Sequence, residues 1–123
     1  MVLETAILCA ALNAHHEARG EPLLGQFAVT HVARNRAKYD PERMCKVIFT
    51  RAQFSWTLTM RGHGSREFER AIQIAHLAWQ SQAVTNGATH YHAISVRPIW
   101  TRKMVVTARI GNHIFYREQV YGR

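Results

Sequence analysis

The hydrophobic pattern of this 123-residue chain changes near Asn86-Gly87, and that change limits the folds that the chain can adopt. Before it, apolar residues recur every three or four positions, which is the period of an α-helix. After it, apolar and polar residues alternate over short runs, which is typical of β-strands. The sequence therefore predicts an α+β fold that is mostly helical, with a small antiparallel sheet in the C-terminal third.

Four helices are expected before this change. One apolar stripe of the first helix is formed by Leu3, Ile7, Ala10 and Ala14. Gly20 suits the end of that helix, and Pro22 suits the first turn of the next. The expected helices cover residues 3–18, residues 22–36, a short segment that starts at Asp40-Pro41, and residues 65–82. The segment between residues 50 and 65 is expected to be irregular.

Three short strands are expected after the change, over residues 88–92, 104–109 and 113–117. Gly111-Asn112 lies between the last two and predicts a turn that joins them. The chain has no repeats, linkers or low-complexity runs. Its length and pattern predict one domain over residues 1–123, and we expect a monomer.

The charge balance favours polyanionic partners. Sixteen Lys and Arg stand against eight Asp and Glu, for a formal net charge of +8. Such a chain is attracted to nucleic acid, anionic lipid or bacterial wall polymers. The sequence has no nucleic-acid-binding signature, so anionic wall or outer-membrane polymers are the favoured partners and nucleic acid is not expected.

Two features of the helical region bear on the compartment. Cys9 and Cys45 lie in apolar surroundings and are expected to be reduced, buried thiols, with a single disulfide as the alternative. The apolar run from Thr5 to Leu12 has no basic residue before it and is too short to cross a bilayer. We therefore expect no transmembrane segment and synthesis in the cytoplasm without a signal peptide.

Glu17 is the strongest candidate for a catalytic residue. It continues the apolar stripe of the first helix by three positions, in the last turn of that helix. Partial burial and the negative end of the helix dipole both disfavour its charged form, so we expect a raised pKa, as a general acid requires. The alternative is a structural glutamate at a helix end, paired with Arg19.

Glu21 is the next carboxylate along the chain, but it precedes Pro22, which disfavours a helical conformation for it. It is expected to cap the second helix by accepting backbone N–H bonds. A retaining glycosidase needs two carboxyl groups roughly 5 Å apart. No convincing second carboxylate is present, which favours a mechanism with one.

An ordered set of motifs resembles the SleB-type spore cortex-lytic and cell-wall hydrolase family. The set begins with Glu17-Ala18-Arg19-Gly20-Glu21 and continues with Gly25-Gln26, Val32-Ala33-Arg34-Asn35-Arg36, Val47-Ile48-Phe49, Gln53-Phe54-Ser55, Gly87-Ala88-Thr89-His90-Tyr91, Pro98-Ile99-Trp100 and Ile110-Gly111-Asn112-His113-Ile114-Phe115-Tyr116. The resemblance covers nearly the whole chain. It implies a lysozyme-like fold and cleavage of the β-1,4 bond between N-acetylmuramic acid and N-acetylglucosamine in peptidoglycan, with no metal or cofactor.

In that family the first glutamate of the motif is catalytic, which corresponds here to Glu17. The implied mechanism is that of a lytic transglycosylase: Glu17 acts as acid and then as base, and the product is a 1,6-anhydro sugar. Hydrolysis by water in the same site is the alternative. A basic catalytic domain without other modules resembles a phage endolysin that acts on the wall in the periplasm after its release, with a bacterial enzyme as the second choice.

Substrate contacts are expected from aromatic and amide side chains, because sugar rings stack on aromatic faces. The residues predicted to bind substrate are Gln53, Phe54, Tyr91, Trp100, Glu21 and His90.

Two other classes of protein stay open. In a zinc-dependent amidase or peptidase, His90 and His92, which alternate on a strand, would bind the metal with His113. The favoured alternative for these residues is that His90 and His92 are hydrogen-bonding residues of a cleft and that His113 is structural. The remaining class is a basic polyanion-binding protein without catalysis.

Overall fold

The computed structural model describes residues 2–51 and 66–119. The elements, in chain order, are α1 (Val2–Glu17), α2 (Leu23–Arg36), α3 (Pro41–Arg51), α5 (Arg66–Gln80), β1 (His90–Ala93), the 3₁₀ helix η1 (Ile99–Lys103), β2 (Met104–Ile110) and β3 (His113–Glu118). They confirm the predicted α+β fold, with boundaries that differ by one or two residues from those expected.

The local signals act as predicted. α2 follows Pro22 as its N-cap residue, and Gly20 has a φ of +85°, a left-handed conformation that glycine adopts without strain. Gly111, in the turn between β2 and β3, has a φ of +56°. No helix in the described part of the chain is both long enough and apolar enough to cross a membrane.

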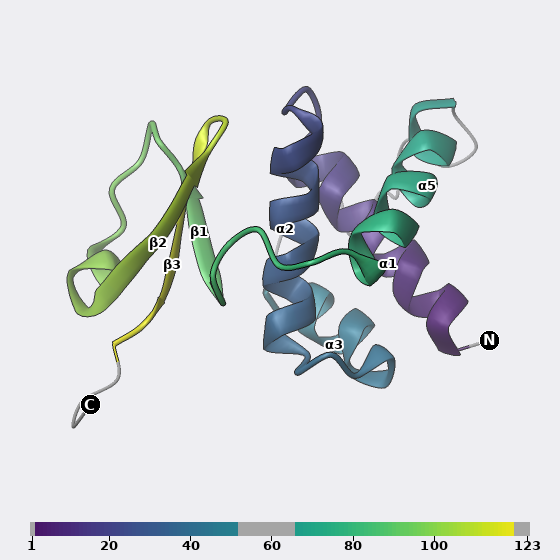
Figure 1. Cartoon of the computed structure of the whole chain (residues 1–123), viewed down its shortest axis with the longest axis horizontal. Coiled ribbons are helices and arrows are strands. Elements are labelled where there is room, and N and C mark those ends of the chain that lie inside the picture. The colour runs from purple at the N-terminus through teal and green to yellow at the C-terminus, as the bar shows by residue number, and fades with distance from the viewer. Residues whose placement is uncertain (1, 52–65, 120–123) are drawn as a thin grey trace.

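Helix α2 is the central layer of the molecule. Figure 1 shows the sheet on one side of α2 and α1 and α5 on the other, with α3 below. One apolar core lies among α1, α3 and α5, where the small residues of α1, such as Ala6 and Ala10, allow close packing. A second core lies between α2 and the sheet, where Val29 and Val32 pack with Phe115. The sheet is therefore held against the helices through α2.

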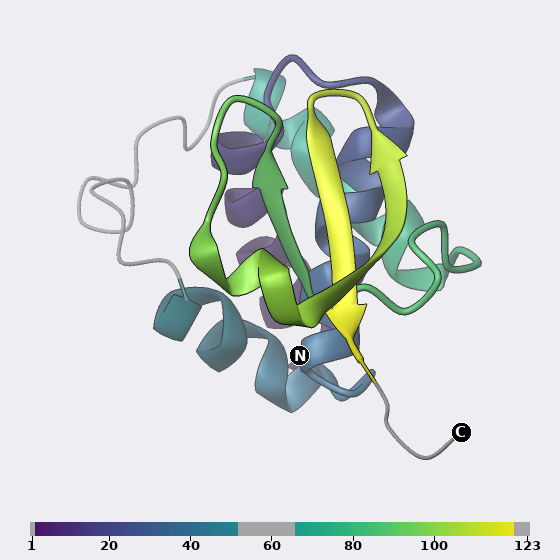
Figure 2. The ribbon, with the colours of Figure 1, turned by 90° about the vertical axis from the view of Figure 1, so that its left-hand side faces the viewer.

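The sheet has the order β1-β3-β2, and both pairings are antiparallel. Side chains alternate between its two faces, as in any β-strand. Tyr91 and Phe115 are paired across β1 and β3 and belong to the core beneath the sheet. His90 and Tyr116, the neighbouring pair, therefore lie on the opposite face, which we call the outer face. Figure 2 looks onto this face, with the helices behind it.

A buried arginine joins α2 to the end of α5. Arg34 is only 2% exposed, and its guanidinium donates hydrogen bonds to the carbonyls of Ala78, Trp79 and Ser81 at 3.1, 2.8 and 2.8 Å. The last carbonyls of a helix lack partners within the helix and carry partial negative charge. Arg34 therefore provides hydrogen-bond donors to the carbonyl groups at the C-terminal end of α5.

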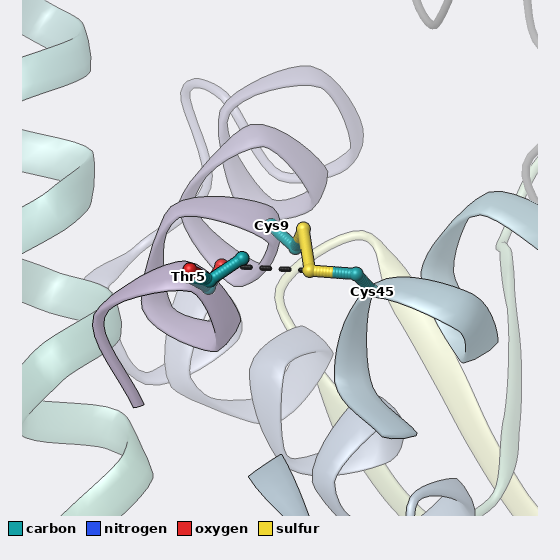
Figure 3. The surroundings of a disulfide bond; sticks show 3 residues. All are labelled: Thr5, Cys9 and Cys45. Atoms are coloured by element: carbon teal, nitrogen blue, oxygen red, sulfur yellow. Dashed lines mark hydrogen bonds between the residues drawn. A yellow bond between two sulfur atoms is a disulfide. The ribbon is translucent and has the colours of Figure 1, made fainter. Parts of the chain in front are cut away.

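The expectation of reduced thiols was wrong. Cys9 of α1 and Cys45 of α3 form a disulfide, with their Cα atoms 5.3 Å apart (Figure 3). The packing of α3 against α1 brings the two residues within disulfide range, which their apolar surroundings in the sequence could not reveal. Sγ of Cys45 also lies 3.5 Å from the carbonyl oxygen of Thr5. The disulfide therefore links α1, which carries Glu17, to α3.

Candidate active site

Glu17 is the last residue of α1 and is half-buried. The backbone N–H of Ala18 donates the last helical hydrogen bond, to the carbonyl oxygen of Ala14. The chain then turns, and the backbone N–H of Glu21 donates to the carbonyl oxygen of Ala18. Ala18 itself is buried in the core beneath the sheet. The carboxyl group of Glu17 is thus attached to a helix end that the packing of its neighbours holds in place.

The side chain of Glu21 fastens this helix end to the sheet. Its Oε1 accepts hydrogen bonds from the backbone N–H of Asn112 at 2.7 Å and from Nδ1–H of His113 at 3.1 Å, and its Oε2 accepts one from Nδ2 of Asn112 at 3.0 Å. The side chains of Glu21 and His113 are only 8% and 9% exposed. In Figure 2 the α1–α2 junction and the β2–β3 turn lie together at the top of the molecule.

Two opposing effects act on the pKa of Glu21. Burial alone raises it, but the hydrogen bonds from the backbone and side chain of Asn112 and from His113 outweigh burial and lower the pKa of Glu21 below its usual value. Because an ionised carboxylate can only accept hydrogen bonds, His113 is the donor in this pair. Glu21 is therefore an anchor held in its charged form.

The predicted capping role of Glu21 was wrong. Helix α2 begins without a side-chain cap, and the Glu21 carboxylate instead binds the hairpin between β2 and β3. The turn fits this contact only because residue 111 is glycine: a Cβ there would collide with Oε1 of Glu21 and would lie 3.2 Å from Cδ of Pro22. A contact between Glu21 and substrate stays a prediction.

The outer face of the sheet carries an aromatic cluster of four residues: His90, His92, Trp100 and Tyr116. The Trp100 ring lies 5.3 Å from the rings of His90 and Tyr116 and 5.8 Å from that of His92. The rings of His92 and Tyr116 are stacked at 5.3 Å. His92 and Tyr116 are buried, whereas Trp100 and His90 are partly exposed and offer flat ring surface of the kind on which sugars stack.

Both histidines of the cluster form hydrogen bonds with neighbouring groups. Nδ1 of His92 lies 2.7 Å from the carbonyl of Ala93, which can only accept, so Nδ1 carries a proton, and Nε2 forms a hydrogen bond with the Tyr116 hydroxyl at 2.8 Å. Nε2 of His90 lies 3.4 Å from Nη1 of Arg36, which can only donate, so Nε2 carries no proton. The predicted hydrogen bonding of His90 and His92 is therefore confirmed, while their place in a substrate cleft stays a prediction.

Tyr91 lies apart from this cluster. It points from β1 into the core beneath the sheet, and its ring is 5.3 Å from His113 and 5.6 Å from Phe115. Tyr91 thus supports the Glu21–His113 contact from below, while its predicted role in substrate binding stays a prediction. Gln53 and Phe54 lie outside the described residues.

The three histidines of the zinc alternative do not meet. His90 and His92 share the outer face, as predicted, but His113 pairs with Ala93 and faces the opposite side, against Tyr91, Phe115 and Glu21. Residues two positions apart on a strand share a face of the sheet, and so do residues paired directly across two strands. His113 therefore shares the face of its partner Ala93, which is opposite to the face of His92. The predicted structural role of His113 is confirmed. The alternative prediction, a zinc site formed by these three histidines, is wrong.

Sequence reasoning missed two of the residues that build the site. The sequence predicts Asn112 as a turn residue and as part of the family motif, but not as the partner of Glu21, which its backbone and side chain both bind. Tyr116 is predicted as part of a strand and of the motif, but not as the partner of His92, on which it stacks. The alternation in residues 113–117 could have placed Tyr116 on a face, but only the pairing of β1 with β3 shows that this face is shared with His90.

Three comparisons place the chain among known proteins. The family described as cell wall hydrolase matches residues 20–116. The catalytic domain of the germination-specific lytic transglycosylase SleB from Bacillus anthracis is similar in structure, with a TM-score of 0.70 and 26% identity over 91% of this chain and 93% of that one. The comparison with curated proteins finds no match.

The catalytic domain of the Bacillus cereus SleB protein is similar to the same degree, with a TM-score of 0.71 and 26% identity over 92% of this chain and 91% of that one. The family match covers most of the chain, and both structures share its four described helices and three-stranded sheet. The chain therefore belongs to the cell wall hydrolase family, and it is a SleB-type, peptidoglycan-degrading enzyme.

Proposed function

We propose that the enzyme cleaves the β-1,4 bond between N-acetylmuramic acid and N-acetylglucosamine as a lytic transglycosylase, with Glu17 as its only catalytic carboxyl group. The similarity to a SleB domain described as a lytic transglycosylase supports the reaction type. The observation that carries the assignment of one carboxyl group is the state of Glu21, whose two oxygens are both bound by the β2–β3 hairpin.

The other carboxylates support the same choice. All eight carboxylates of the chain lie within the described residues. Apart from Glu17 and Glu21, they lie at the start of α1, around the start of α3, on α5 and at the end of β3. Those of Asp40 and Glu67 form ion pairs with Arg43 and Arg19. This distribution supports the proposal that Glu17 acts without a second carboxyl group.

In the proposed reaction, protonated Glu17 donates its proton to the glycosidic oxygen as the bond to the anomeric carbon of muramic acid breaks. An oxocarbenium-like centre develops, and the Glu17 carboxylate then takes the proton of the muramic 6-hydroxyl. The oxygen of that hydroxyl bonds to the anomeric carbon and closes the 1,6-anhydro ring. One residue acts as acid and then as base, and water is not consumed.

We propose that Trp100 and His90 bind the glycan, because they are the two partly exposed rings of the aromatic cluster on the outer face. We include Gln53, Phe54, Tyr91 and Glu21 in the proposed site on the strength of the sequence resemblance. Anionic wall or outer-membrane polymers are proposed as additional partners, because the chain carries a formal net charge of +8.

The disulfide supports action in an oxidising compartment, since such bonds persist outside the reducing cytoplasm. This agrees with an enzyme that meets its substrate in the wall. The role of a phage endolysin stays a prediction from the sequence.

The products and one substitution test the proposal. Mass spectrometry of the muropeptides released from purified peptidoglycan should show a sugar end that is lighter by one water molecule than the hydrolysed form. Glu17→Gln should abolish release while the protein stays folded, because an amide cannot donate the proton. Glu69→Gln, at an exposed position on α5, is the matched control. Wild-type activity of Glu17→Gln would contradict the assignment of Glu17 as the catalytic residue. Released muropeptides with reducing sugar ends would show that the enzyme hydrolyses the bond instead.

A further inference from the structure

A groove of about 460 Å³ opens beside the helix end that carries Glu17. Its walls come from the end of α1, the α1–α2 junction, the start of α2 and one face of α5. Ala14, Arg19 and Glu21, which lie within four residues of Glu17 in the sequence, line this groove, whereas Glu17 does not. The groove is therefore adjacent to the proposed catalytic residue but separate from it.

Short aliphatic side chains and charged groups share the lining. Ala14, Ala71 and Ile74 are buried and form the apolar floor of the groove, and Leu23, on the side of α2, is exposed. Arg19, after α1, and Arg70, on α5, contribute positive charge, and Glu21 and Glu67 contribute negative charge. Such a surface suits a flexible chain that carries methyl groups and carboxylates, because methyl groups fill small apolar hollows and guanidinium groups bind carboxylates.

The charges in the groove are not equally available. Arg19 forms an ion pair with Glu67, and the carboxylate of Glu21 is bound to the hairpin. Arg70 is exposed and forms no ion pair with any residue in the ranges 2–51 and 66–119. The two arginines and two glutamates of the lining have a formal net charge of zero, but Arg70 is the lining cation that no carboxylate in these ranges pairs with, so it can bind a carboxylate of a ligand.

We infer that this groove binds the peptide stem that the muramic acid residue carries, with Arg70 against a stem carboxylate and the methyl-bearing residues of the stem over Ala14, Ala71 and Ile74. This inference rests on the proposed function, because it places the muramic acid beside Glu17. An extended peptide spans about 3.3–3.6 Å per residue, so a stem of a few residues reaches from the end of α1 to α5. The enzyme would then prefer glycan strands that still carry their peptides.

Two matched substrates test this preference: intact peptidoglycan, and glycan strands from which an amidase has removed the stems. The measured quantity is kcat/KM on intact peptidoglycan divided by kcat/KM on the stem-free strands. Arg70→Glu should lower this ratio about fivefold or more, which corresponds to the loss of one exposed charge-assisted contact. Lys46→Glu makes the same charge change at an exposed position on α3 and should leave the ratio unchanged. An unchanged ratio in Arg70→Glu would overturn the inference.

A binding measurement separates this inference from the reaction itself. Free stem tetrapeptide, added to the whole protein, should shift the NMR signals of the Arg70 side chain and of the Ala71 and Ile74 methyl groups. Arg70→Glu should show no such shifts. If the wild-type protein cleaves neither substrate, the proposed function fails and this titration alone decides the inference: shifts at these residues support it, and their absence overturns it.

Discussion

The carboxylate of Glu21 accepts two hydrogen bonds from Asn112, a residue 91 positions away in the sequence. One comes from the Asn112 backbone and one from its side chain, at 2.7 and 3.0 Å. Through this contact the junction that follows Glu17 is fastened to the β2–β3 turn. The position of the proposed catalytic residue therefore depends on a strand hairpin at the other end of the chain.

Glu21→Gln should destabilise the fold and slow the enzyme, although Glu17 stays intact. The glutamine amide keeps one oxygen acceptor, but its NH₂ group faces donors and cannot accept from them, so at least one hydrogen bond of the set is lost. The expected loss is about 1–3 kcal/mol in the free energy of unfolding, measured by urea denaturation. Glu42→Gln, at an exposed position, should change it by less than about 0.5 kcal/mol. Equal stability of the two variants would show that the contact contributes nothing.

Stability should fall as the pH drops below neutral, because His31 is fully buried. Its Nδ1 accepts a hydrogen bond from the backbone of Val84, so the ring is neutral, with its proton on Nε2. Burial, aided by the charge of Arg34, lowers the pKa of His31 to about 4. The unfolded chain therefore binds this proton below about pH 6.5 while the folded chain does not.

The resulting loss in the free energy of unfolding between pH 7 and pH 5 is roughly 1–2 kcal/mol for this residue. His31→Gln, which keeps a donor and an acceptor, should reduce the slope of unfolding free energy against pH in that range. His76→Gln, at an exposed position on α5, should leave the slope unchanged. A slope in His31→Gln as steep as in the wild type would contradict the prediction.

Reduction of the disulfide should lower the melting temperature. The bond closes a loop with a sequence separation of 36 residues, and a loop of that size corresponds to about 3–4 kcal/mol of lost chain entropy in the unfolded state. Calorimetry with and without reductant measures the shift. The double variant Cys9→Ala, Cys45→Ala should melt at the lower temperature under both conditions. If reductant shifts the double variant as much as the wild type, the effect does not come from this bond.

Trp100→Ala should weaken substrate binding more than it weakens the fold. Removal of the indole takes away the ring that contacts His90, His92 and Tyr116, and with it the surface proposed for sugar stacking. A rise of about 3–10-fold in KM on peptidoglycan is expected, with Trp100→Phe nearer to the wild type. Ile99→Ala, at the neighbouring position, which is 77% exposed, is the control. An equal effect of Ile99→Ala and Trp100→Ala would argue against a specific role for the ring.

Local features of the sequence were sufficient for the order of elements and for the place of Glu17. The stripe through Ile7, Ala10 and Ala14 is buried, and Glu17 ends the helix as predicted. The turn at Gly111-Asn112 is also found where it was expected. These features follow from hydrophobic periodicity and from the backbone preferences of Gly and Pro, which act over a few residues and can be read without knowledge of the packing.

By itself, then, the sequence determined the elements, their order, the family resemblance and the helix end that carries the proposed acid. Only the tertiary structure decided which residues meet: Glu21 with Asn112 and His113, Cys9 with Cys45, and Trp100 with Tyr116. It also decided that His113 faces away from His90 and His92. The physical reason is that these contacts join residues far apart in the chain, so they depend on strand pairing and on the packing of α2 between the sheet and α1, which local preferences do not specify.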